Sequence, residues 1–591
     1  MAKTKQSTTK SRKAQSFIQF GLVVGIILFV NVLANQFYGH IDFTEDKRYS
    51  LTPATKELVK NLDDYVSFEV FLDGEFPAAF ARLQNSLRDL LADFRSLNKR
   101  IDYQFTDPND GNVEQINRSR EALAARGIFP VNLQVRGGDE YSEKLIYPGV
   151  IVRYRGREIP VNILENNSPG TPQDVVLNNS ASLLEYKLTN AIAKLQTVRQ
   201  PKIAILTNHG ELQPYETASL EFKLDQFYQL ARINLDSVTV ISDKIDLLVV
   251  PKPTRTFSER DKFIIDQYMM NGGRSIWLID RLTTSMDSLR NRAGAEYIPI
   301  DYPLNIEDLL FRYGVRINPN VVLDVQCSKI PIEVGRMGNQ PQFDLRPWVY
   351  FPVVLPDFEN DHPIVKSLDA IDFQFANTID TLKTKTPVKK TILLKSSKYS
   401  RLQFTPFRLG LDIARVPPTP EKYNKGEQPL AVLLEGQFPS LYENRVSESM
   451  TAGLEELGQT YKAVSAPTKM LVVADGDVAR NNFDFQKNQP TELGFNPYER
   501  YTFANADFLL NAVEYMMDDN GIIASRSKEL KLRLLDRARL AEESSFLGIP
   551  MRTKVKWQIL NVTLPLILLL IFGWTYQRLR RRKFSTNVQA V

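Results

Sequence analysis

The last apolar stretch of the chain, Trp557 to Tyr576, constrains the fold more than any other feature of the sequence. It holds twenty residues without a charged side chain, which is the length that an α-helix needs to cross the hydrocarbon core of a bilayer. Aromatic residues stand at both ends, where amphipathic rings prefer the headgroup region. A buried helix of a soluble core is the alternative, but such helices seldom lack charge over this length. The sequence therefore predicts a transmembrane helix over 557–576.

A cationic cluster follows this stretch directly. Its members are Arg578, Arg580, Arg581, Arg582 and Lys583. Lys and Arg are enriched on the cytoplasmic side of transmembrane helices. We therefore expect residues 577–591 to form a cytoplasmic basic tail in contact with membrane lipid, and the body of the chain to lie outside the cytoplasm.

A second uncharged apolar stretch runs from Phe17 to Phe37, after an N-terminal segment that carries five cations and no acid. It is long enough to span a bilayer. A cleaved signal peptide is the alternative, but the stretch is long for a signal and its small-residue cleavage site is poorly formed. The sequence predicts an uncleaved helix over 17–38 behind a cytoplasmic tail at 1–16. The chain would then cross a bacterial inner membrane twice, with both termini cytoplasmic and its bulk periplasmic.

Composition excludes several classes of function. The net charge of +5 is modest and falls largely at the chain ends, so we expect no nucleic-acid partner. The single cysteine, Cys327, rules out an intrachain disulfide and any cysteine-based zinc or iron–sulfur centre. No histidine lies near Cys327 in sequence to activate its thiol. We expect no metal, no cofactor and no enzymatic activity.

Residues 46–198 predict a thioredoxin-like α/β domain. Strands are expected at 65–72 and 101–106, separated by a long amphipathic helix at 76–98. A redox protein of this type carries a CxxC motif after the first strand. Here that position reads Asp73-Gly74-Glu75, so thiol redox chemistry is excluded.

Residues 200–525 predict a doubly wound α/β domain. Apolar strands at 202–206, 246–250, 275–279 and 470–474 alternate with helices such as 215–230, the pattern of a parallel sheet. We expect 281–430 to be an insertion. Within it, the proline- and aromatic-rich stretch 341–356 suits a partner-docking loop, a covering flap or an ordinary packed segment. A juxtamembrane stalk helix is expected over 526–555.

The candidate site lies where these strands end, because ligands of such sheets bind beyond the carboxyl ends of the strands. Asn208, His209 and Glu211 follow the first strand, and Asp280 follows the third. An imidazole and a carboxylate two residues apart are suited to binding a polar ligand or a partner, or to acid–base chemistry. They are equally suited to capping the next helix, which we favour. Asp475-Gly476-Asp477 resembles the start of a calcium loop, but the later ligands are missing, so a tight turn is favoured.

Nucleotide-binding and common hydrolase motifs are absent from the sequence. It contains no P-loop, no GxGxxG, no GxSxG and no HExxH. Any ATP-driven process that involves this chain therefore needs an ATPase on another chain.

Several stretches together resemble the GldG family, gliding-motility-associated proteins of Bacteroidetes described as auxiliary or substrate-binding-like components of an ABC transporter. The stretches are DKRYSLTPATKELVKNL (46–62), TNHGE (207–211), DLLVVPKPTRTFSERDKFIIDQYMMNGGRSIWLID (246–280), MLVVADGDVARN (470–481) and KLRLLDRARL (531–540). The third is also similar to glutamine-amidotransferase-like domains of intraflagellar transport proteins. The catalytic cysteine of true amidotransferases has no counterpart here, so that activity is not implied.

The resemblance implies a non-catalytic inner-membrane subunit of a GldA/GldF/GldG-like complex, linked to gliding motility or the associated secretion. Its partners would be a GldF-like permease and a GldA-like cytoplasmic ATPase, with a homodimer within the complex as a further option. Two alternatives stay open. One is a membrane-anchored periplasmic receptor for a solute or partner, and the other is a hydrolase of amidotransferase-like fold.

Overall fold

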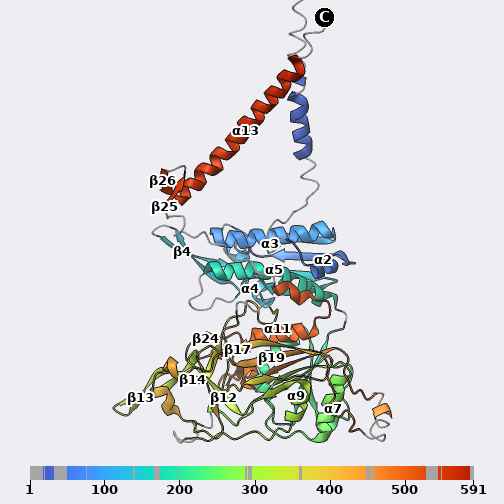
Figure 1. Ribbon diagram of the computed structural model, residues 1–591, viewed down its shortest axis with the longest axis vertical. Helices are drawn as coiled ribbons and strands as arrows, with labels where there is room; N and C mark the ends of the chain where they lie inside the picture. The colour runs from blue at the N-terminus through green and yellow to red at the C-terminus, as the bar shows by residue number, and fades with distance from the viewer. Residues whose placement is uncertain are drawn as a thin grey trace, which may run out of the picture. The chain divides into compact units, whose positions relative to one another are not determined.

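The structure is a computed structural model of the 591-residue chain, and it separates into two compact units, Met1–Leu530 and Lys531–Val591 (Figure 1). The residues that it describes are 17–18, 20–31, 50–74, 76–137, 140–165, 173–197, 199–286, 289, 296–357, 362–446, 454–456, 460–527, 543–546 and 549–585.

A four-stranded sheet with the order β2-β1-β5-β6 forms the first part of the larger unit. Its strands are β1 (Val66–Val70), β2 (Ile101–Phe105), β5 (Gly149–Tyr154) and β6 (Arg157–Asn162), and its helices are α2 (Pro53–Lys60), α3 (Ala78–Leu97), α4 (Val113–Ala125) and α5 (Gln173–Gln196). β1 pairs parallel with β2 and antiparallel with β5. The alternating side chains Val66, Phe68 and Val70 are buried in one cluster with α3 and α5, as expected for a strand with one covered face. Ile151, on the opposite face, packs against Leu123 of α4.

A seven-stranded sheet forms the second part, with the order β17-β19-β20-β10-β9-β7-β8. Its strands are β7 (Lys202–Thr207), β8 (Gln229–Asn234), β9 (Leu247–Pro251), β10 (Arg274–Leu278), β17 (Val388–Lys395), β19 (Pro429–Gly436) and β20 (Thr468–Val473). The five strands from β20 to β8 run parallel, whereas β19 and β17 are antiparallel to their neighbours. β17 comes from the 281–430 stretch and forms one edge of the sheet.

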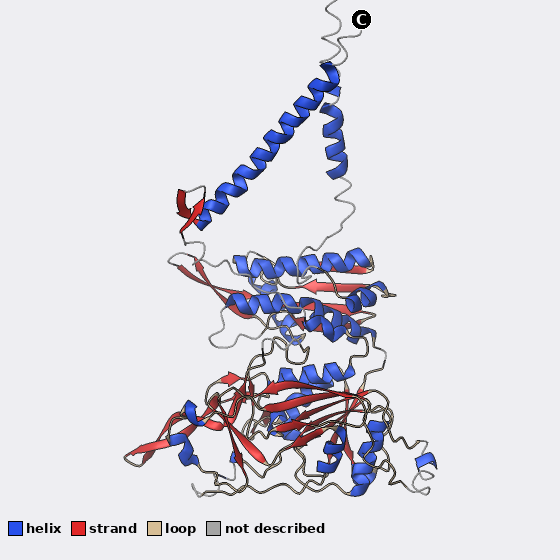
Figure 2. Cartoon of the chain, in the orientation of Figure 1, coloured by secondary structure: helices blue, strands red, loops and turns tan. Residues whose placement is uncertain are grey.

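Helices cover both faces of this sheet (Figure 2). The helices are α6 (Pro214–Asp225), α7 (Glu259–Met270), α9 (Glu307–Tyr313) and α11 (Asn505–Met517). Side chains of α6 and α11 share one buried cluster with the sheet, and those of α7 and α9 share the other. Two covered faces explain why β9 and β20 are apolar without alternation. A mixed α/β fold is therefore confirmed.

The four-stranded part is joined to α11 by a buried polar contact. The carboxylate of Glu514 on α11 accepts hydrogen bonds from Asn190 (3.1 Å) and Lys194 (2.5 Å) on α5. Tyr186 of α5 also donates to Glu514. Because these partners compensate the buried charge of Glu514, removal of any one of them would leave that charge partly unpaired inside the body.

The stretch 341–356 lies largely in a long hairpin, whose inner part is packed in the body as expected for an ordinary packed segment. The hairpin consists of β13 (Cys327–Met337) and β14 (Gln340–Val354). The end of β14 also pairs antiparallel with β15 (Ile371–Asp372). Trp348, Tyr350 and Phe351 are buried in the body, whereas Phe343 near the hairpin end is 62% exposed.

The other paired strands of the larger unit form two-stranded sheets. They are β3 (Val131–Gly137) with β4 (Glu140–Ile146), β11 (Val315–Ile317) with β16 (Ile379–Thr381), β12 (Asn320–Asp324) with β18 (Ser400–Phe404), β21 (Phe483–Asp484) with β22 (Gln489–Pro490), and β23 (Phe495–Asn496) with β24 (Tyr501–Thr502).

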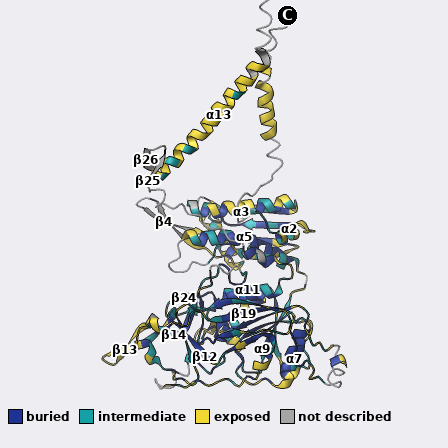
Figure 3. Cartoon of the chain, viewed as in Figure 1, coloured by how far each residue is buried: buried dark blue, intermediate teal, exposed yellow. Residues whose placement is uncertain are grey.

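The smaller unit contains one strongly apolar helix, α13 (Thr553–Ser585), after the hairpin of β25 (Glu543–Phe546) and β26 (Ile549–Arg552). The most apolar 18 residues of Thr553–Leu579 have a mean hydropathy of 1.9, and none of them is buried within the structure, as Figure 3 shows. A helix long and apolar enough to cross a membrane is therefore confirmed over 557–576. The Arg578 guanidinium lies 4.5 Å from the centre of the Trp574 ring. Aromatic rings at the headgroup level and cations just beyond them are typical of the end of a transmembrane helix.

The second expected span, over 17–38, is not confirmed. The described apolar helix there is Phe20–Asn31, which is shorter than a bilayer core requires, and residues 32–38 lie outside the described part of the chain. Residues 528–542 of the expected stalk helix over 526–555 also lie outside it. The described residues 543–546 and 549–552 form the hairpin of β25 and β26, so the prediction of a continuous helix over 526–555 is wrong.

Candidate functional site

The carboxyl ends of β7, β9, β10 and β20 meet at one edge of the seven-stranded sheet, because these strands are parallel neighbours. The polar residues that follow them form two clusters. Asn208, His209 and Glu211 belong to the first, which we call the His209 cluster. Asp280 belongs to the second, which we call the carboxylate cluster.

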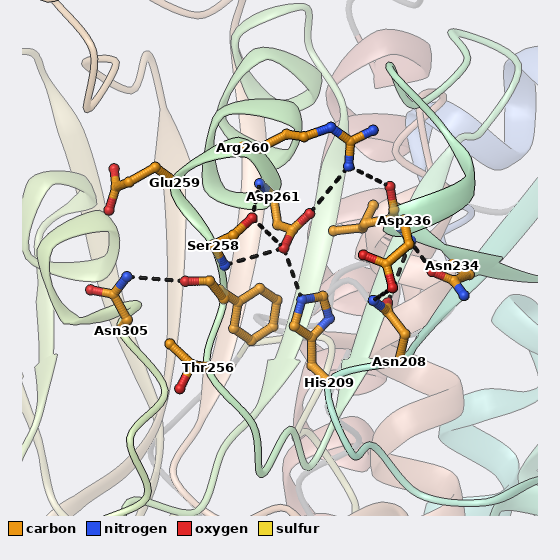
Figure 4. Close-up of polar contacts among 12 residues, drawn as sticks. Asn208, His209, Asn234, Asp236, Thr256, Ser258, Glu259, Arg260, Asp261 and Asn305 are labelled. Atoms are coloured by element: carbon orange, nitrogen blue, oxygen red, sulfur yellow. Dashed lines mark hydrogen bonds and ion pairs between the residues drawn. The ribbon is translucent and has the colours of Figure 1, made fainter.

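The His209 cluster is a closed packing unit (Figure 4). The imidazole stacks on Phe257 with 3.8 Å between ring centres and 5° between planes. Its Nε2 lies 3.3 Å from Asp261 Oδ2, and its Nδ1 lies 3.4 Å from Glu211 Oε1. The side chain of His209 is only 3% exposed, so the ring is closed to an external ligand, although Nδ1 is buried without completing a hydrogen bond among the described residues.

Electrostatics favour the protonated form of His209 in this setting. Burial lowers the pKa of the imidazole, but the hydrogen bonds and charges of Glu211 and Asp261 outweigh burial, and the net pKa is raised. A general base must instead be neutral and within reach of a substrate proton. The geometry therefore suits a buried ion triad better than acid–base chemistry.

Glu211 closes the turn after β7 and does not cap the next helix. Its Oε2 accepts a hydrogen bond from the backbone N–H of His209 at 2.7 Å. The N-terminus of α6 is served by Glu216, whose carboxylate accepts from the N–H of Gln213 at 2.8 Å. Asn208 takes a left-handed backbone with φ of 86°, which asparagine tolerates, and donates to Asp236 at 3.0 Å. The favoured capping of the next helix is therefore wrong, and these side chains bond within the turn and to Asp236 instead.

The carboxylate cluster surrounds a lysine that the sequence did not single out. Lys252 Nζ lies 2.9 Å from Asp280 Oδ2 and 2.5 Å from Asp477 Oδ2. Oxygens of Asp280, Asp475 and Asp477 lie within 4.8 Å of one another, the one such metal-compatible group among the described residues. Three carboxylates at this spacing would suit a divalent cation, but the ammonium group of Lys252 already supplies the compensating charge.

The Asp475-Gly476-Asp477 segment is a tight turn, as favoured over a calcium loop. Asp475 Oδ1 accepts from the N–H of Asp477 at 2.7 Å, and Asp280 Oδ1 accepts from the N–H of Gly476 at 2.5 Å. Lys252 itself has φ of 55°. A Cβ at Gly476 would come within 2.5 Å of the Lys252 side chain, so only glycine permits this approach.

Burial shapes the protonation of this cluster. It raises the pKa of Asp280 and, further, that of Asp475. Burial would lower the pKa of Lys252, but Asp280 and Asp477 outweigh it and raise the pKa. Lys252 therefore stays charged and cannot act as a base or nucleophile. The sequence does carry a signal for Lys252. The residue directly follows a buried strand, in the sequence PKP.

A cavity of about 350 Å³ adjoins the carboxylate cluster. Its lining includes Phe351, Asp372, Phe375, Asp477 and Arg480. Burial raises the pKa of Asp372 to about 7, and the charges of Glu499 and Asp477 add to the effect. Asp372 was not singled out because it lies in the 281–430 stretch, where the sequence carries no recognisable motif.

Replacing Asp372 with Asn is expected to stabilise the protein in a pH-dependent way. The pKa of about 7 in the folded state exceeds the ordinary 3.8, so the folded state binds the proton more tightly than the unfolded state. Below about pH 4 both states hold it and the variant gains nothing; the gain grows up to about pH 7, to roughly 1–3 kcal/mol. Urea midpoints of the detergent-purified chain at pH 4, 6 and 8 test this. Asp102→Asn, at a side chain that is 72% exposed, should show no such trend, and parallel curves for the two variants would refute the expectation.

Cys327 has no sign of a nucleophilic role. Burial raises the pKa of its thiol to about 12, and reactive cysteines have lowered values instead.

The cationic cluster that follows the apolar stretch lies within the same helix. Its five members on α13 are Arg578, Arg580, Arg581, Arg582 and Lys583.

Taken together, the fold and the site define an α/β protein with a C-terminal helix long and apolar enough to cross a membrane, whose strand-end charged groups pair with one another. Residues 200–512 match the family model described as "ABC-type uncharacterized transport system", a family of auxiliary proteins. The chain belongs to this family, so it is a transport-associated accessory protein. Residues 45–153 match a domain of unknown function. These matches do not distinguish GldG from other members.

A relative and two solved structures complete the comparison. An uncharacterized protein of Borreliella burgdorferi is 22% identical over 446 residues, which are 73% of this chain and 79% of that protein. The mmIFT52 N-terminal domain is 12% identical with a TM-score of 0.29, covering 54% of this chain and 98% of that one. A putative ThuA-like protein from Parabacteroides merdae is 11% identical with a TM-score of 0.23, covering 53% of this chain and 88% of that one. At TM-scores this low, neither solved structure assigns a fold family to this chain.

Proposed function

We propose that this chain is a non-catalytic inner-membrane subunit of a GldA/GldF/GldG-like ABC transport complex. A GldF-like permease and a GldA-like cytoplasmic ATPase are its partners, and the complex serves gliding motility or the associated secretion. The bulk of the chain, with a thioredoxin-like domain at 46–198 and an amidotransferase-like domain at 200–525, lies in the periplasm. Helices at 17–38 and 557–576 anchor it, with both termini in the cytoplasm.

The observation that carries this proposal is the state of the strand ends. In a catalytic α/β domain, the groups at this edge remain available to a substrate. Here His209 is enclosed by Glu211, Asp261 and Phe257, and Lys252 is enclosed by Asp280 and Asp477. Together with membership in an auxiliary transport family, this favours a body that positions other subunits over one that performs chemistry.

Copurification tests the proposal. The chain, tagged after Val591 and expressed from its own locus, is extracted in mild detergent, and the bound proteins are identified by mass spectrometry. A permease and an ATPase should be recovered in comparable amounts. A tagged unrelated membrane protein of similar size serves as the control. Recovery of this chain alone, or of the same proteins with the control, would count against the proposed complex.

Topology is tested separately by reporters fused after Val591. A fluorescent protein that folds only in the cytoplasm should be bright there, because the cationic residues 578–583 favour the cytoplasmic side. Alkaline phosphatase at the same position should be inactive. The opposite pair of results would place the C-terminus in the periplasm and invalidate the two-pass arrangement.

A further inference from the structure

The cavity beside the carboxylate cluster has the features of a built ligand site. Its volume of about 350 Å³ lies at the lower end of the range for small-molecule pockets. It is formed by segments far apart in the sequence: β14 contributes Phe351, β15 contributes Asp372, the turn after β20 contributes Asp477, and the start of α11 contributes Asn505. Such convergence fixes the cavity in the rigid body and does not leave it to one loop.

Hydrogen-bond acceptors dominate the buried polar lining. Oδ1 of Asp372 is buried and completes no hydrogen bond among the described residues, and Oδ1 of Asp477 is buried with an ion pair to Arg480 at 3.6 Å but no hydrogen bond. A buried carboxylate oxygen without a donor is costly, so a ligand that donates to it would bind favourably. The Asp477 side chain is 6% exposed, and the backbone of Asp372 is fixed by Asn505 through bonds of 3.0 and 2.8 Å.

The cations in the lining are engaged or peripheral. Arg480 lies 3.0 Å from Glu216 and 3.6 Å from Asp477, and Lys329 is an exposed residue at the edge of the cavity. An anionic ligand would have to compete with these carboxylates for Arg480. The lining therefore favours a positively charged ligand over a negatively charged one.

Aromatic rings form the apolar part of the cavity. Phe351 and Phe375 pack edge to face, with 5.2 Å between ring centres, and both line the cavity with Phe495. Aromatic faces attract cations and also bury apolar groups. Acceptors on one side and rings on the other match a ligand with an ammonium group and an apolar portion.

We infer that this cavity binds a small organic amine, whose ammonium group donates to Asp372 Oδ1 and whose apolar portion lies against Phe351 and Phe375. This goes beyond the proposed subunit role, because it gives the body a ligand of its own. No bond is made or broken on binding.

Calorimetric titration of the detergent-purified full chain with phenethylamine tests the inference. Two matched probes are 2-phenylethanol, which lacks the charge, and 3-phenylpropionate, which reverses it. Phenethylamine should bind at least tenfold more tightly than either. Asp372→Asn should weaken phenethylamine binding at least tenfold while the protein remains folded, and Asp102→Asn should bind as the unaltered chain does.

Several results would overturn the inference. They are no heat of binding at millimolar phenethylamine, equal binding of the alcohol, tighter binding of the carboxylate, or unchanged binding by Asp372→Asn. A Phe375→Leu variant provides a second readout, since the loss of one ring should weaken the aromatic amine more than methylamine. Equal weakening of both amines would also contradict the assigned geometry.

Discussion

Lys252→Met is expected to lower the free energy of unfolding by about 3–5 kcal/mol at pH 7, the typical cost of removing one partner from a buried ion pair. The substitution keeps the length of the side chain but leaves Asp280, Asp475 and Asp477 without the ammonium group that now lies 2.9 Å from Asp280. Denaturant midpoints of the detergent-purified chain, followed by tryptophan fluorescence, measure the loss. Trp277, fully buried on the neighbouring strand β10, places a reporter close to the change.

Two further measurements identify the cause of this loss. Acidification should shrink it, because burial has raised the pKa of Asp280 and Asp475 and the protonated carboxyls no longer need a cation. Added Mn²⁺ or Ca²⁺ should restore part of the stability, because oxygens of the three carboxylates lie within 4.8 Å of one another. Lys389→Met, at a side chain that is 73% exposed, is the control and should change little. A loss that responds to neither acid nor divalent cations would mean that packing, and not charge, explains the role of Lys252.

His209→Ala should have the next largest effect, a loss of about 2–4 kcal/mol at pH 6. The variant removes the stacked contact with Phe257 at 3.8 Å and leaves two buried carboxylates facing each other without the imidazole. The pKa of His209 is raised in the folded state, so its charge contributes fully below about pH 6.5. That contribution is lost as the pH rises through the folded pKa. The difference between the unaltered chain and the variant should therefore narrow between pH 6 and pH 9.

His362→Ala offers a matched control with the opposite slope. Burial lowers the pKa of His362 to about 4, so this ring is neutral in the folded state and its presence becomes unfavourable as the pH falls below about 6.5. Any stability lost in this variant should shrink on acidification. If His209→Ala left stability unchanged at every pH, the His209 cluster would not be a structural ion triad.

The parallel strands were predictable because two covered faces demand unbroken apolar runs. The expected strands 202–206, 246–250, 275–279 and 470–474 correspond to β7, β9, β10 and β20 within two residues at each end. The order of these strands in the sheet was not predictable, because the edge strand β8 was not recognised. β8 begins at Gln229, within the last two residues of the expected helix 215–230, whereas α6 already ends at Asp225.

The hairpin over 341–356 was missed because its proline residues obscure a strand pattern. Pro347 pairs with Lys329 and Pro352 with Cys327 across irregular register, which sequence periodicity cannot show.

The residues of the site were found only in part, because sequence periodicity does not show which strand ends meet. Asp280 was expected from its place after a strand, but its partner Lys252 follows a different strand, and Asp372 reaches the cavity from a short strand with no motif.

The pairing of β10 with β20 governs the order in which the chain can fold. Ser275 pairs with Met470, while the strands that precede β10 pair among themselves. Contacts this distant along the chain form slowly. During synthesis, the apolar strands of the first half therefore have one sheet edge open until β20 has been made. Efficient production of this protein should thus depend on chaperones that shield that edge until β20 pairs with β10.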